Sequence, residues 1–462
     1  MRPGVLRAYQ SLPAGLRSLA ATVRGHRLNA WRYGPETERL VAEALEREHW
    51  PAERWRAWRD QRLAQVLDRA ARRVPFYRER WAERRRRGDR ASWEVLEHWP
   101  VLGKEALRAD PRAFVADDRD PRRMFHAHTS GTSGKPVMLW WRRPTLRAWY
   151  ALFEARLRRW NGVTRDDRLA MVGGQLVVPF ERTTPPYWVW NGAMRQLYMS
   201  SYHLRPEAVP AYLDAIRRYR VRYALGYASS LHSLALLALE QGLDAPRLGV
   251  ALTNAEPLTE AQRGAIGRAF DCPVRETYGM TEMVCGATEC DRGHLHLWPE
   301  AGMLEVLGDD SDEPCAAGAV GRFVCTGLLD EDMPLVRYEV GDRGTAPAHA
   351  RPCACGRTLP VLTGIEGRQD DVVLTRDGRR IGRLDPVFKA DLPLREAQIV
   401  QETRERLRVR LVPAAGWGPA HEADLAARIR GRVGDMEIVF DRVGEIPRSA
   451  NGKFRAVVSQ LR

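Results

Sequence analysis

The sequence predicts an α/β protein, with a large multi-lobed N-terminal domain that begins in a helical extension and a small α+β domain at the C-terminus. The chain has 462 residues, too many for one ordinary hydrophobic core, which favours two or three lobes. From about residue 124, short apolar runs that end in glycine or small residues alternate with helical stretches, as in α/β sheets. After about residue 370, short strand-like segments accompany one predicted helix near 421–433, and this tail is long enough for a separate domain.

The first part of the chain has helical periodicity. Apolar residues over 63–74 recur at helical spacing, and Pro75 ends that helix. The densest basic run, residues 84–87, continues a polar helical stretch and is interpreted as an exposed helix end. We therefore expect a helical N-terminal region over residues 1–110.

The central region, which we expect to span residues 111–369, combines strands with helices over 207–220 and 231–240. Strand ends followed by small polar turns are where α/β sheets bind ligands. Three apolar segments end in this way, namely 169–172 before Gly173, 223–225 before the turn at 226–230, and 250–252 before the turn at 253–256. The stretch from 300 to 366 is richer in β pattern, with candidate strands at 323–325 and 334–338. We expect residues 370–462 to form the small C-terminal domain.

The formal net charge of the chain is +14, from 73 Lys and Arg against 59 Asp and Glu. Such a balance is compatible with a nucleic-acid, membrane or anionic small-molecule partner. The basic residues are spread along the chain, which favours solvated helix faces in an Arg-rich sequence. Because no helix-turn-helix, zinc-finger or base-stacking motif is present, we expect no nucleic-acid partner.

The cysteine content and the hydrophobicity profile favour a cytoplasmic protein. The seven cysteines are an odd number, and the first 30 residues lack an apolar core of signal-peptide length, which argues against a disulfide framework. No stretch of about 18 apolar residues is present, so we expect no transmembrane segment. The mixed apolar and basic N-terminus leaves attachment to a membrane surface as an alternative.

A run of hydroxyl and glycine residues follows the apolar-leaning segment 124–128. It consists of Thr129, Ser130, Gly131, Thr132, Ser133, Gly134 and Lys135. Its backbone N–H groups, its hydroxyls and the lysine are suited to bind phosphates, and glycine permits close approach. The spacing differs from the nucleoside-triphosphatase loop, because Pro136 stands where that loop needs Ser or Thr. Taken alone, such a run is also typical of a flexible turn.

Four further motifs follow in a fixed order. They are Tyr278-Gly279-Met280-Thr281-Glu282, Tyr338-Glu339-Val340-Gly341-Asp342-Arg343, Gly367-Arg368-Gln369-Asp370-Asp371, and Ile446-Pro447-Arg448-Ser449-Ala450-Asn451-Gly452-Lys453-Phe454-Arg455. Their joint occurrence resembles the adenylate-forming superfamily of acyl-coenzyme A synthetases, adenylation domains and luciferases.

Within that superfamily the chain resembles the phenylacetate–coenzyme A ligase branch, including relatives found with capsule and exopolysaccharide biosynthesis. The resemblance covers residues from about 50 to 462. It depends on Val74-Pro75-Phe76-Tyr77-Arg78, Trp99-Pro100-Val101-Leu102-Gly103-Lys104, Lys135-Pro136, and Cys353-Ala354-Cys355-Gly356-Arg357-Thr358-Leu359-Pro360. It implies an adenylate-forming N-terminal domain and a mobile C-terminal lid.

The resemblance also implies how ATP is bound. The loop from Thr129 to Lys135 would hold the β and γ phosphates, and Glu282 would bind Mg²⁺, a hard cation that prefers carboxylate and phosphate oxygens. Thr281 would contact the α-phosphate. The adenine would be flanked by Tyr278 and the turn Asn254-Ala255-Glu256, and Gly279 would belong to the same nucleotide site.

The remaining implied roles lie on the ribose and at the domain junction. Asp342 would accept both ribose hydroxyls, as a carboxylate can, and Arg368 would reach the ribose or the phosphates. Asp370 would be the hinge. Lys453 would arrive from the C-terminal domain and stabilise charge on the carboxylate and the α-phosphate, which is transition-state stabilisation by a mobile cation.

The implied activity is that of an AMP-forming acid–thiol ligase with ATP, Mg²⁺ and coenzyme A as cofactors. A small-molecule carboxylic acid would be converted to an acyl adenylate with release of pyrophosphate, and then to a thioester. Two alternatives are an acceptor other than coenzyme A in polysaccharide biosynthesis, and a non-catalytic nucleotide-binding relative. The acid pocket would involve Trp140, the turn at 226–230 and Met280. The acid and the oligomeric state are left open.

A second cluster has the composition of a zinc site. Cys290, His296, Cys353 and Cys355 could form a tetrahedral Cys₃His site for structural Zn²⁺, and Cys285 could take the place of one ligand. The spacing Cys-x-Cys is not the usual one for zinc, and buried free thiols are the alternative.

Overall fold

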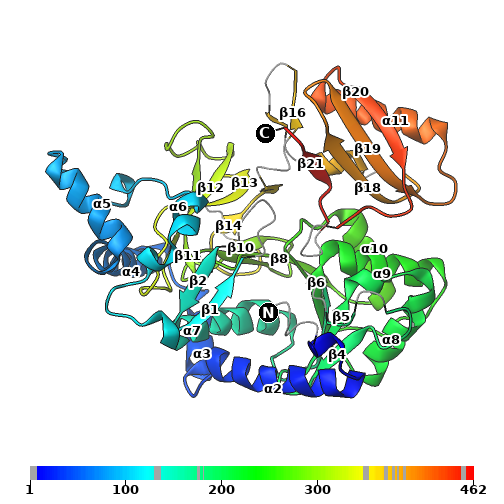
Figure 1. Ribbon diagram of the computed structural model, residues 1–462, viewed down its shortest axis with the longest axis horizontal. Coiled ribbons are helices and arrows are strands. Elements are labelled where there is room, and N and C mark those ends of the chain that lie inside the picture. The colour runs from blue at the N-terminus through cyan, green and yellow to red at the C-terminus, as the bar shows by residue number, and fades with distance from the viewer. Residues whose placement is uncertain are drawn as a thin grey trace.

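The computed structural model describes residues 8–129, 137–173, 177–179, 182–346, 353–368, 373–376, 380–381, 384–388, 392–448 and 454–461. Figure 1 shows a large N-terminal domain below a smaller C-terminal domain, which is drawn in orange and red. The predicted α/β class is confirmed. Residues 369–372 lie outside the described part, so the boundary between 369 and 370 stays a prediction.

Helices make up most of the described part of the N-terminal region. Its helices are α2 (Ala14–Arg32), α3 (Thr37–Arg47), α4 (Ala52–Arg73), α5 (Pro75–Arg86) and α6 (Lys104–Ala109). Pro75 both ends α4 and begins α5, because its missing N–H is tolerated in the first turn of a helix. The basic run at 84–87 forms the end of α5, and the side chains from Arg85 to Arg87 are exposed.

A nine-stranded sheet runs through the N-terminal domain in the order β14-β10-β9-β8-β7-β6-β3-β5-β4. The strands from β5 through β3, β6 and β7 to β8 are parallel, and antiparallel strands flank them on both sides. Their bounds are β3 Leu169–Gly173, β4 Trp188–Asn191, β5 Gln196–Ser200, β6 Tyr223–Tyr227, β7 Ala251–Asn254, β8 Val274–Gly279, β9 Gly286–Glu289, β10 Leu295–Leu297 and β14 Val361–Leu362. The strands predicted at 169–172, 223–225 and 250–252 are confirmed.

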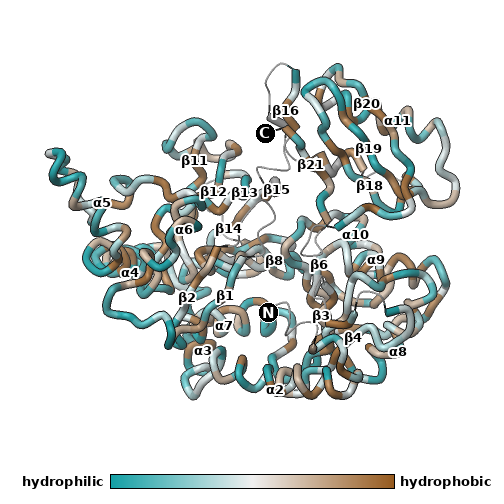
Figure 2. Tube along the Cα trace, in the orientation of Figure 1, coloured by the Kyte–Doolittle hydropathy of each residue, from teal (hydrophilic) through white to brown (hydrophobic). Residues whose placement is uncertain are grey.

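Helices cover both faces of this sheet. On one face, α8 (Val209–Arg218), α9 (Ala228–Glu240) and α10 (Glu260–Phe270) pack against alternate strand residues such as Ala170 and Ala224. On the other face, Leu157 of the π-helical turn Phe153–Arg158, which continues α7 (Arg143–Leu152), packs against Leu169 and Leu225. Figure 2 shows the central strands as hydrophobic, in agreement with burial on both faces.

Two smaller sheets complete the N-terminal domain. One is the hairpin of β1 (Phe125–His128) and β2 (Met138–Trp141). The other has the order β11-β12-β13-β15 and the bounds β11 Gly302–Leu307, β12 Val320–Gly327, β13 Tyr338–Thr345 and β15 Ile365–Arg368. The strand predicted at 334–338 is wrong except for its last residue. Arg337 has φ +46°, and its buried guanidinium is fixed by the Trp99 carbonyl and Glu305, so the chain turns before β13 begins.

The C-terminal domain contains an antiparallel pair extended by one parallel strand on each side, in the order β20-β19-β18-β21. Its elements are β16 Val373–Leu374, β17 Arg380–Ile381, β18 Leu394–Gln401, β19 Arg406–Pro413, α11 Pro419–Val433, β20 Glu437–Arg442 and β21 Val457–Ser459. Leu425 and Ile429 of α11 pack on Ile399 and Val409 of the sheet. The predicted helix near 421–433 is confirmed as α11.

Candidate functional site

The carboxyl ends of the parallel strands β6, β7 and β8 meet at one edge of the nine-stranded sheet. Tyr227 and Asn254 are register partners across β6 and β7, and Thr253 pairs with Glu276 across β7 and β8. The turns that follow these three strands therefore lie side by side, as expected for ligand sites in parallel sheets. We refer to these turns, 227–230, 254–256 and 278–282, as the strand-edge site.

The middle turn carries two signs of a ligand-binding role. Ala255 has φ +62°, a left-handed conformation that is strained for a residue with a Cβ. The side-chain oxygen of Asn254 is buried and has no hydrogen-bond partner among the residues that the structure describes. An unpaired buried oxygen is costly, so it marks a position where a donor from a ligand would be stabilised.

Glu256 connects the strand-edge site to the C-terminal domain. Its Oε2 accepts a hydrogen bond of 2.9 Å from Ser229 N at the start of α9, and its Oε1 accepts one of 2.8 Å from Phe454 N. Burial raises the pKa of this carboxyl above its ordinary value, while the two N–H donors oppose that shift. The C-terminal domain therefore contacts this edge through Phe454, the residue after Lys453 in the sequence, and Lys453 itself lies outside the described residues.

The last turn positions one acidic residue through a tyrosine. The Tyr278 hydroxyl donates a 2.8 Å hydrogen bond to Oδ2 of Asp342 on β13. Burial, and then the neighbouring Asp342 carboxylate, raise the pKa of Tyr278 well above its ordinary value, so the hydroxyl stays a donor. Asp342 and Arg368 are register partners across β13 and β15, which brings the backbone of Arg368 next to this pair.

A second tyrosine–carboxylate pair joins β13 to the turn at 278–282. The Tyr338 hydroxyl donates a 3.0 Å hydrogen bond to Oε1 of Glu282, and burial raises the pKa of Tyr338. Glu282 is half-buried, and Thr281 beside it is exposed. The segment 99–104 supports this arrangement, because Leu102 bridges to Tyr338 and Lys104 Nζ donates to the Val340 carbonyl over 2.6 Å.

No role was predicted for Tyr338, and Ser229 was expected only as part of the turn at 226–230. Tyr338 begins the motif that contains Asp342, so it was in view, but its partner Glu282 is 56 positions away in the chain. Ser229 takes part through its backbone N–H, which no side-chain pattern reveals.

Several predicted site residues lie outside the described residues, namely Ser130, Gly131, Thr132, Ser133, Gly134, Lys135, Asp370 and Lys453. The base of the predicted phosphate loop is described. Thr129 N donates to the Val137 carbonyl over 3.0 Å, and Val137 N donates to Thr129 Oγ1 over 3.0 Å. These two bonds hold the ends of the loop together at the mouth of the β1–β2 hairpin.

The turn at 226–230 is buried except at Tyr227, which is half-buried. Burial raises the pKa of Tyr227 to about 12 and lowers that of His232 to about 4, so both side chains are neutral at pH 7. A Cβ on Gly226 would collide with the Val172 carbonyl, which only glycine avoids. Trp140 is buried in a hydrophobic cluster against which Met280 also packs.

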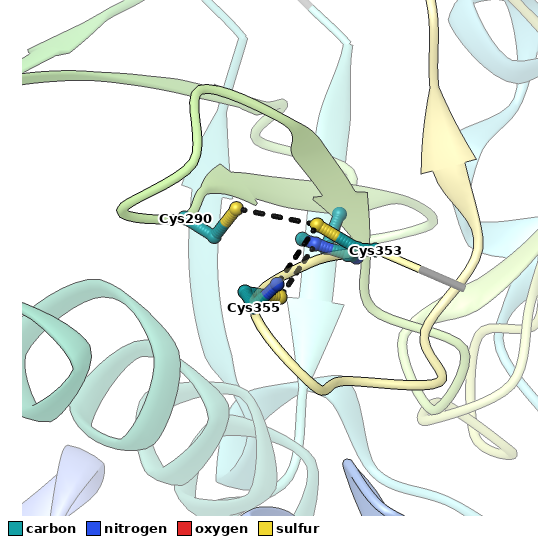
Figure 3. A group of neighbouring side chains, drawn as sticks. Cys290, Cys353 and Cys355 are labelled. Atoms are coloured by element: carbon teal, nitrogen blue, oxygen red, sulfur yellow. Dashed lines mark hydrogen bonds between the residues drawn. The ribbon is translucent and has the colours of Figure 1, made fainter. Parts of the chain in front are cut away.

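The predicted cysteine–histidine cluster is assembled in the structure. The ligand atoms of Cys290, His296, Cys353 and Cys355 all lie within 4.8 Å of one another. Cys290 Sγ is 3.9 Å from Cys353 Sγ, and Cys355 Sγ is 3.4 Å from Nε2 of His296. Figure 3 shows Cys290, next to the end of β9, facing Cys353 and Cys355 of the loop before β14.

Neighbouring groups orient this cluster. His296 Nδ1 lies 3.0 Å from the Leu359 carbonyl, an acceptor that places the proton on Nδ1 and leaves Nε2 free to coordinate. His294 Nδ1 lies 3.3 Å from Cys353 Sγ. The suggestion that Cys285 could serve as a ligand is wrong, because Cys285 is buried beside Cys325, to which it is hydrogen-bonded.

The loop that carries Cys353 and Cys355 is fastened to the N-terminal helices. Arg357 forms an ion pair of 3.0 Å with Glu48 and lies 4.0 Å over the ring of Trp160. Thr358 N and Thr358 Oγ1 both donate to the Glu48 carbonyl. Burial raises the pKa of Glu48, and the two cations Arg156 and Arg357 oppose that shift. This buried network gives the cluster a rigid surround.

The comparisons with known proteins agree with this arrangement. Residues 56–328 match the family described as AMP-binding enzyme, and residues 373–460 match the CapK C-terminal domain. The chain is 27% identical to phenylacetate-coenzyme A ligase of Thermus thermophilus, with 92% of this chain and 99% of the relative covered. It is 22% identical to protein CapK of Staphylococcus aureus, with 87% and 89% covered.

A solved structure has the same fold. The crystal structure of 2-hydroxyisobutyryl-CoA ligase in the postadenylation state, in complex with R3-HIB-AMP, superposes with a TM-score of 0.70 at 21% identity and covers 90% of this chain and 91% of that chain. None of the helices among the described residues combines the length and the hydrophobicity needed to cross a membrane. Because the family match extends over more than half of its length, the chain belongs to the family of AMP-binding enzymes.

Proposed function

We propose that this protein uses ATP and Mg²⁺ to activate a small carboxylic acid as an acyl adenylate, and then transfers the acyl group to the thiol of coenzyme A. The observation that carries the proposal is the pairing of two carboxylates with tyrosine hydroxyls at the strand edge, Asp342 with Tyr278 and Glu282 with Tyr338. The Thermus relative and the superposed structure are both named as ligases of coenzyme A, which supports the same chemistry.

We assign the nucleotide to the strand-edge site. The unpaired oxygen of Asn254 would accept a hydrogen bond from the exocyclic amine of adenine, and Ala255, Glu256 and Gly279 would complete the walls of this pocket. Asp342 would accept the ribose hydroxyls, because a carboxylate has lone pairs beyond the one that Tyr278 uses. Arg368, whose backbone pairs with that of Asp342, would reach the ribose or the phosphates.

Glu282 is the residue that we assign to Mg²⁺. A half-buried carboxylate oriented by one hydroxyl donor keeps its second oxygen for a hard cation, and such a cation usually needs only one or two protein carboxylates besides phosphate oxygens and water. When bound, the cation would neutralise phosphate charge. Thr129 and the loop that follows it would hold the β and γ phosphates, and Thr281 would contact the α-phosphate.

The reaction has two steps. In the first, a carboxylate oxygen of the acid forms a bond to the α-phosphorus, and the bond from that phosphorus to the bridging oxygen breaks, so pyrophosphate leaves. In the second, the sulfur of coenzyme A, having lost its proton, attacks the acyl carbon and AMP leaves. Lys453 would stabilise negative charge in the first step. The C-terminal domain would then rotate about Asp370 and present a different surface to the site for the second step.

The test is pyrophosphate release from ATP and Mg²⁺ with a panel of aromatic and aliphatic acids, with and without coenzyme A. Lys453→Ala should abolish acid-dependent release. Lys389→Ala is the matched control, since Lys389 is the other lysine that follows residue 370. Release without formation of an acyl-coenzyme A product would favour a different acceptor, such as a hydroxyl or amine of a polysaccharide precursor. Measurable ATP binding without release for any acid would favour a non-catalytic relative.

We also propose that Cys290, His296, Cys353 and Cys355 hold a structural Zn²⁺. In a tetrahedral site with Zn–S bonds of about 2.3 Å and Zn–N bonds of about 2.0 Å, two sulfurs are separated by about 3.8 Å, and a sulfur and a nitrogen by about 3.5 Å. The corresponding separations here are 3.9 Å and 3.4 Å. The donor set fits the metal, and the group lies in the rigid surround of Glu48 and Arg357.

Metal analysis of the purified protein tests this site. We expect one zinc per chain, and we expect Cys355→Ser to lose it. Cys315→Ser is the control, because Cys315 is a free cysteine that the metal-binding group does not include. A chain without zinc, or equal zinc contents in both variants, would leave the cluster as a set of buried thiols.

For the compartment we propose the cytoplasm. All seven cysteines are free in the structure, as expected where thiols are kept reduced. ATP and coenzyme A, the proposed substrates, are soluble cofactors of that compartment. If part of the protein sediments with membranes, this assignment holds only if that part is attached peripherally to the membrane surface.

A further inference from the structure

The outward face of helix α2 is apolar. Among the described residues, six large hydrophobic side chains are exposed, and half of them are on this helix, namely Leu16 at 49%, Leu19 at 59% and Val23 at 63%. Positions three and four apart share one side of a helix, so these side chains form a continuous stripe. The other exposed apolar side chains include Leu239 and Val320, which lie singly on α9 and β12 at 39% and 40%.

The inward face of α2 is polar and is fixed to the edge strand β4. Ser18 Oγ accepts a hydrogen bond of 3.3 Å from Trp190 N, and Thr22 Oγ1 accepts one of 2.9 Å from Gly192 N. Asn29 Nδ2 donates to the Ala193 carbonyl over 2.7 Å. Gly25 lies so close to the side chain of Asn191 that a Cβ at this position would collide with it. The helix therefore cannot roll to bury its apolar stripe without breaking these bonds.

This pattern is the reverse of an ordinary surface helix, which buries its apolar stripe and exposes its polar face. The stripe therefore needs a covering from outside the described chain. Single exposed apolar side chains are common on protein surfaces, but a continuous row on one helix indicates an interaction face.

Charge identifies the kind of surface that would cover it. The first 35 residues contain six arginines and no Asp or Glu. Arg24 and Arg27 on α2 are exposed, and neither has an ion-pair partner within the described ranges. At 100° per residue, the exposed Arg27 and Arg24 follow one side of the stripe formed by Leu16, Leu19 and Val23. An apolar stripe bordered by arginines complements an anionic lipid surface.

A second copy of the chain is a poorer occupant. Pairing two such helices would bring the same arginines together, on two chains that each carry a formal charge of +14. Insertion across a bilayer is also excluded for α2, which contains four arginines among its 19 residues and is not long and apolar enough to span.

We propose that α2 attaches the protein peripherally to an anionic lipid bilayer, with Leu16, Leu19 and Val23 at the level of the acyl-chain boundary and the arginines among the headgroups. Figure 1 shows α2 along the lower edge of the N-terminal domain, on the side away from the C-terminal domain. Attachment through this edge leaves the C-terminal domain in water and does not depend on which reaction the strand-edge site performs.

The experiment is cosedimentation of the full chain with vesicles of equal parts phosphatidylglycerol and phosphatidylcholine, and with vesicles of phosphatidylcholine alone. The test variant is Leu19→Glu with Val23→Glu. The matched control is Leu239→Glu with Val320→Glu, which makes the same change in charge at exposed apolar positions on other elements. Circular dichroism and thermal unfolding establish that each variant is folded.

We expect the wild type and the control to bind the anionic vesicles, with an affinity that falls as salt is raised, and to bind phosphatidylcholine weakly. The α2 variant should bind at least about tenfold more weakly while remaining folded. The proposal is overturned if the wild type does not bind anionic vesicles at low salt, or if the two variants lose binding equally. It is also overturned if light scattering shows that the α2 variant changes the molar mass of the protein in solution without changing vesicle binding.

Discussion

The strand-edge site and the cysteine–histidine cluster differ in the kind of ligand atom that they offer. The strand-edge site presents oxygen atoms of Asn254 and Glu282 next to Asp342 of β13. All three residues are half-buried, and one turn is held in a left-handed conformation. The cluster presents sulfur from two loops and imidazole nitrogen from β10, and the loop with Cys353 and Cys355 is attached to Glu48 through Arg357. A site that must release its ligand at every turnover stays accessible, whereas one that keeps its ligand is enclosed. Changes at the first should therefore affect activity, and changes at the second should affect stability.

The largest expected effect is at Glu282. Replacing it with Gln keeps the shape of the side chain but removes the charge that we assign to Mg²⁺, so kcat for pyrophosphate release should fall by about 10²- to 10³-fold. The melting temperature should be nearly unchanged. Glu313→Gln, at an exposed position between β11 and β12, is the control for loss of one carboxylate. A loss of activity that is smaller than threefold would remove Glu282 from the proposed site.

The next effect tests the other side of the comparison. Cys355→Ser should lower the free energy of unfolding by about 3 kcal/mol, since loss of a metal belongs to the most destabilising classes of substitution. Denaturant unfolding with and without a chelator measures it, and chelation should destabilise the wild type but have little further effect on this variant. If the variant unfolds like the wild type but is inactive, the cluster serves activity and not stability, which would contradict the role that we give it.

Tyr278→Phe should have an intermediate effect confined to the nucleotide. Removing the hydroxyl takes away one donor to the Asp342 carboxylate, and a hydrogen bond to a charged group contributes about 1.5–3 kcal/mol. We expect KM for ATP to rise by about tenfold, with KM for the acid unchanged. Tyr219→Phe, in a stacked pair with Trp190 on the sheet edge, serves as the control. Equal changes in both KM values would indicate general distortion of the site.

An effect confined to acidic pH is expected at His232 of α9. Burial lowers its pKa from 6.5 to about 4, so the unfolded chain takes up a proton at a higher pH than the folded chain does. The stabilising contribution is present above pH 6.5 and is lost as the pH falls towards 4, by about 1.4 kcal/mol over each pH unit within this window. His232→Gln should flatten this part of the stability profile. Parallel profiles for the wild type and His232→Gln would show that this histidine is not the titrating group.

The sequence identified the strand ends and the residue types of both sites, but not the contacts between them. Glu282 and Tyr338 are 56 positions apart, and Tyr278 and Asp342 are 64 apart, so only the tertiary fold, which places β13 of the four-stranded sheet next to the end of β8, joins them. The cluster was predictable because cysteine and histidine side chains that lie near one another are typical of metal sites. The strand expected at 334–338 failed because Arg337 uses its side chain in a buried ion pair and turns the backbone. No helical pattern could reveal that α2 buries its polar face, since the edge strand that selects this face comes about 170 residues later.

The bonds from Arg357 and Thr358 to Glu48 span 309 and 310 positions of sequence. During synthesis, helices α3 and α4 leave the ribosome long before the loop that completes their surroundings exists. Until residue 358 has emerged, the Glu48 carboxylate lacks Arg357, and the nascent N-terminal region remains without one of its anchors. Since chains grow by about 5 to 20 residues per second, this interval lasts for tens of seconds, and the early helices depend throughout it on chaperones or on their own packing.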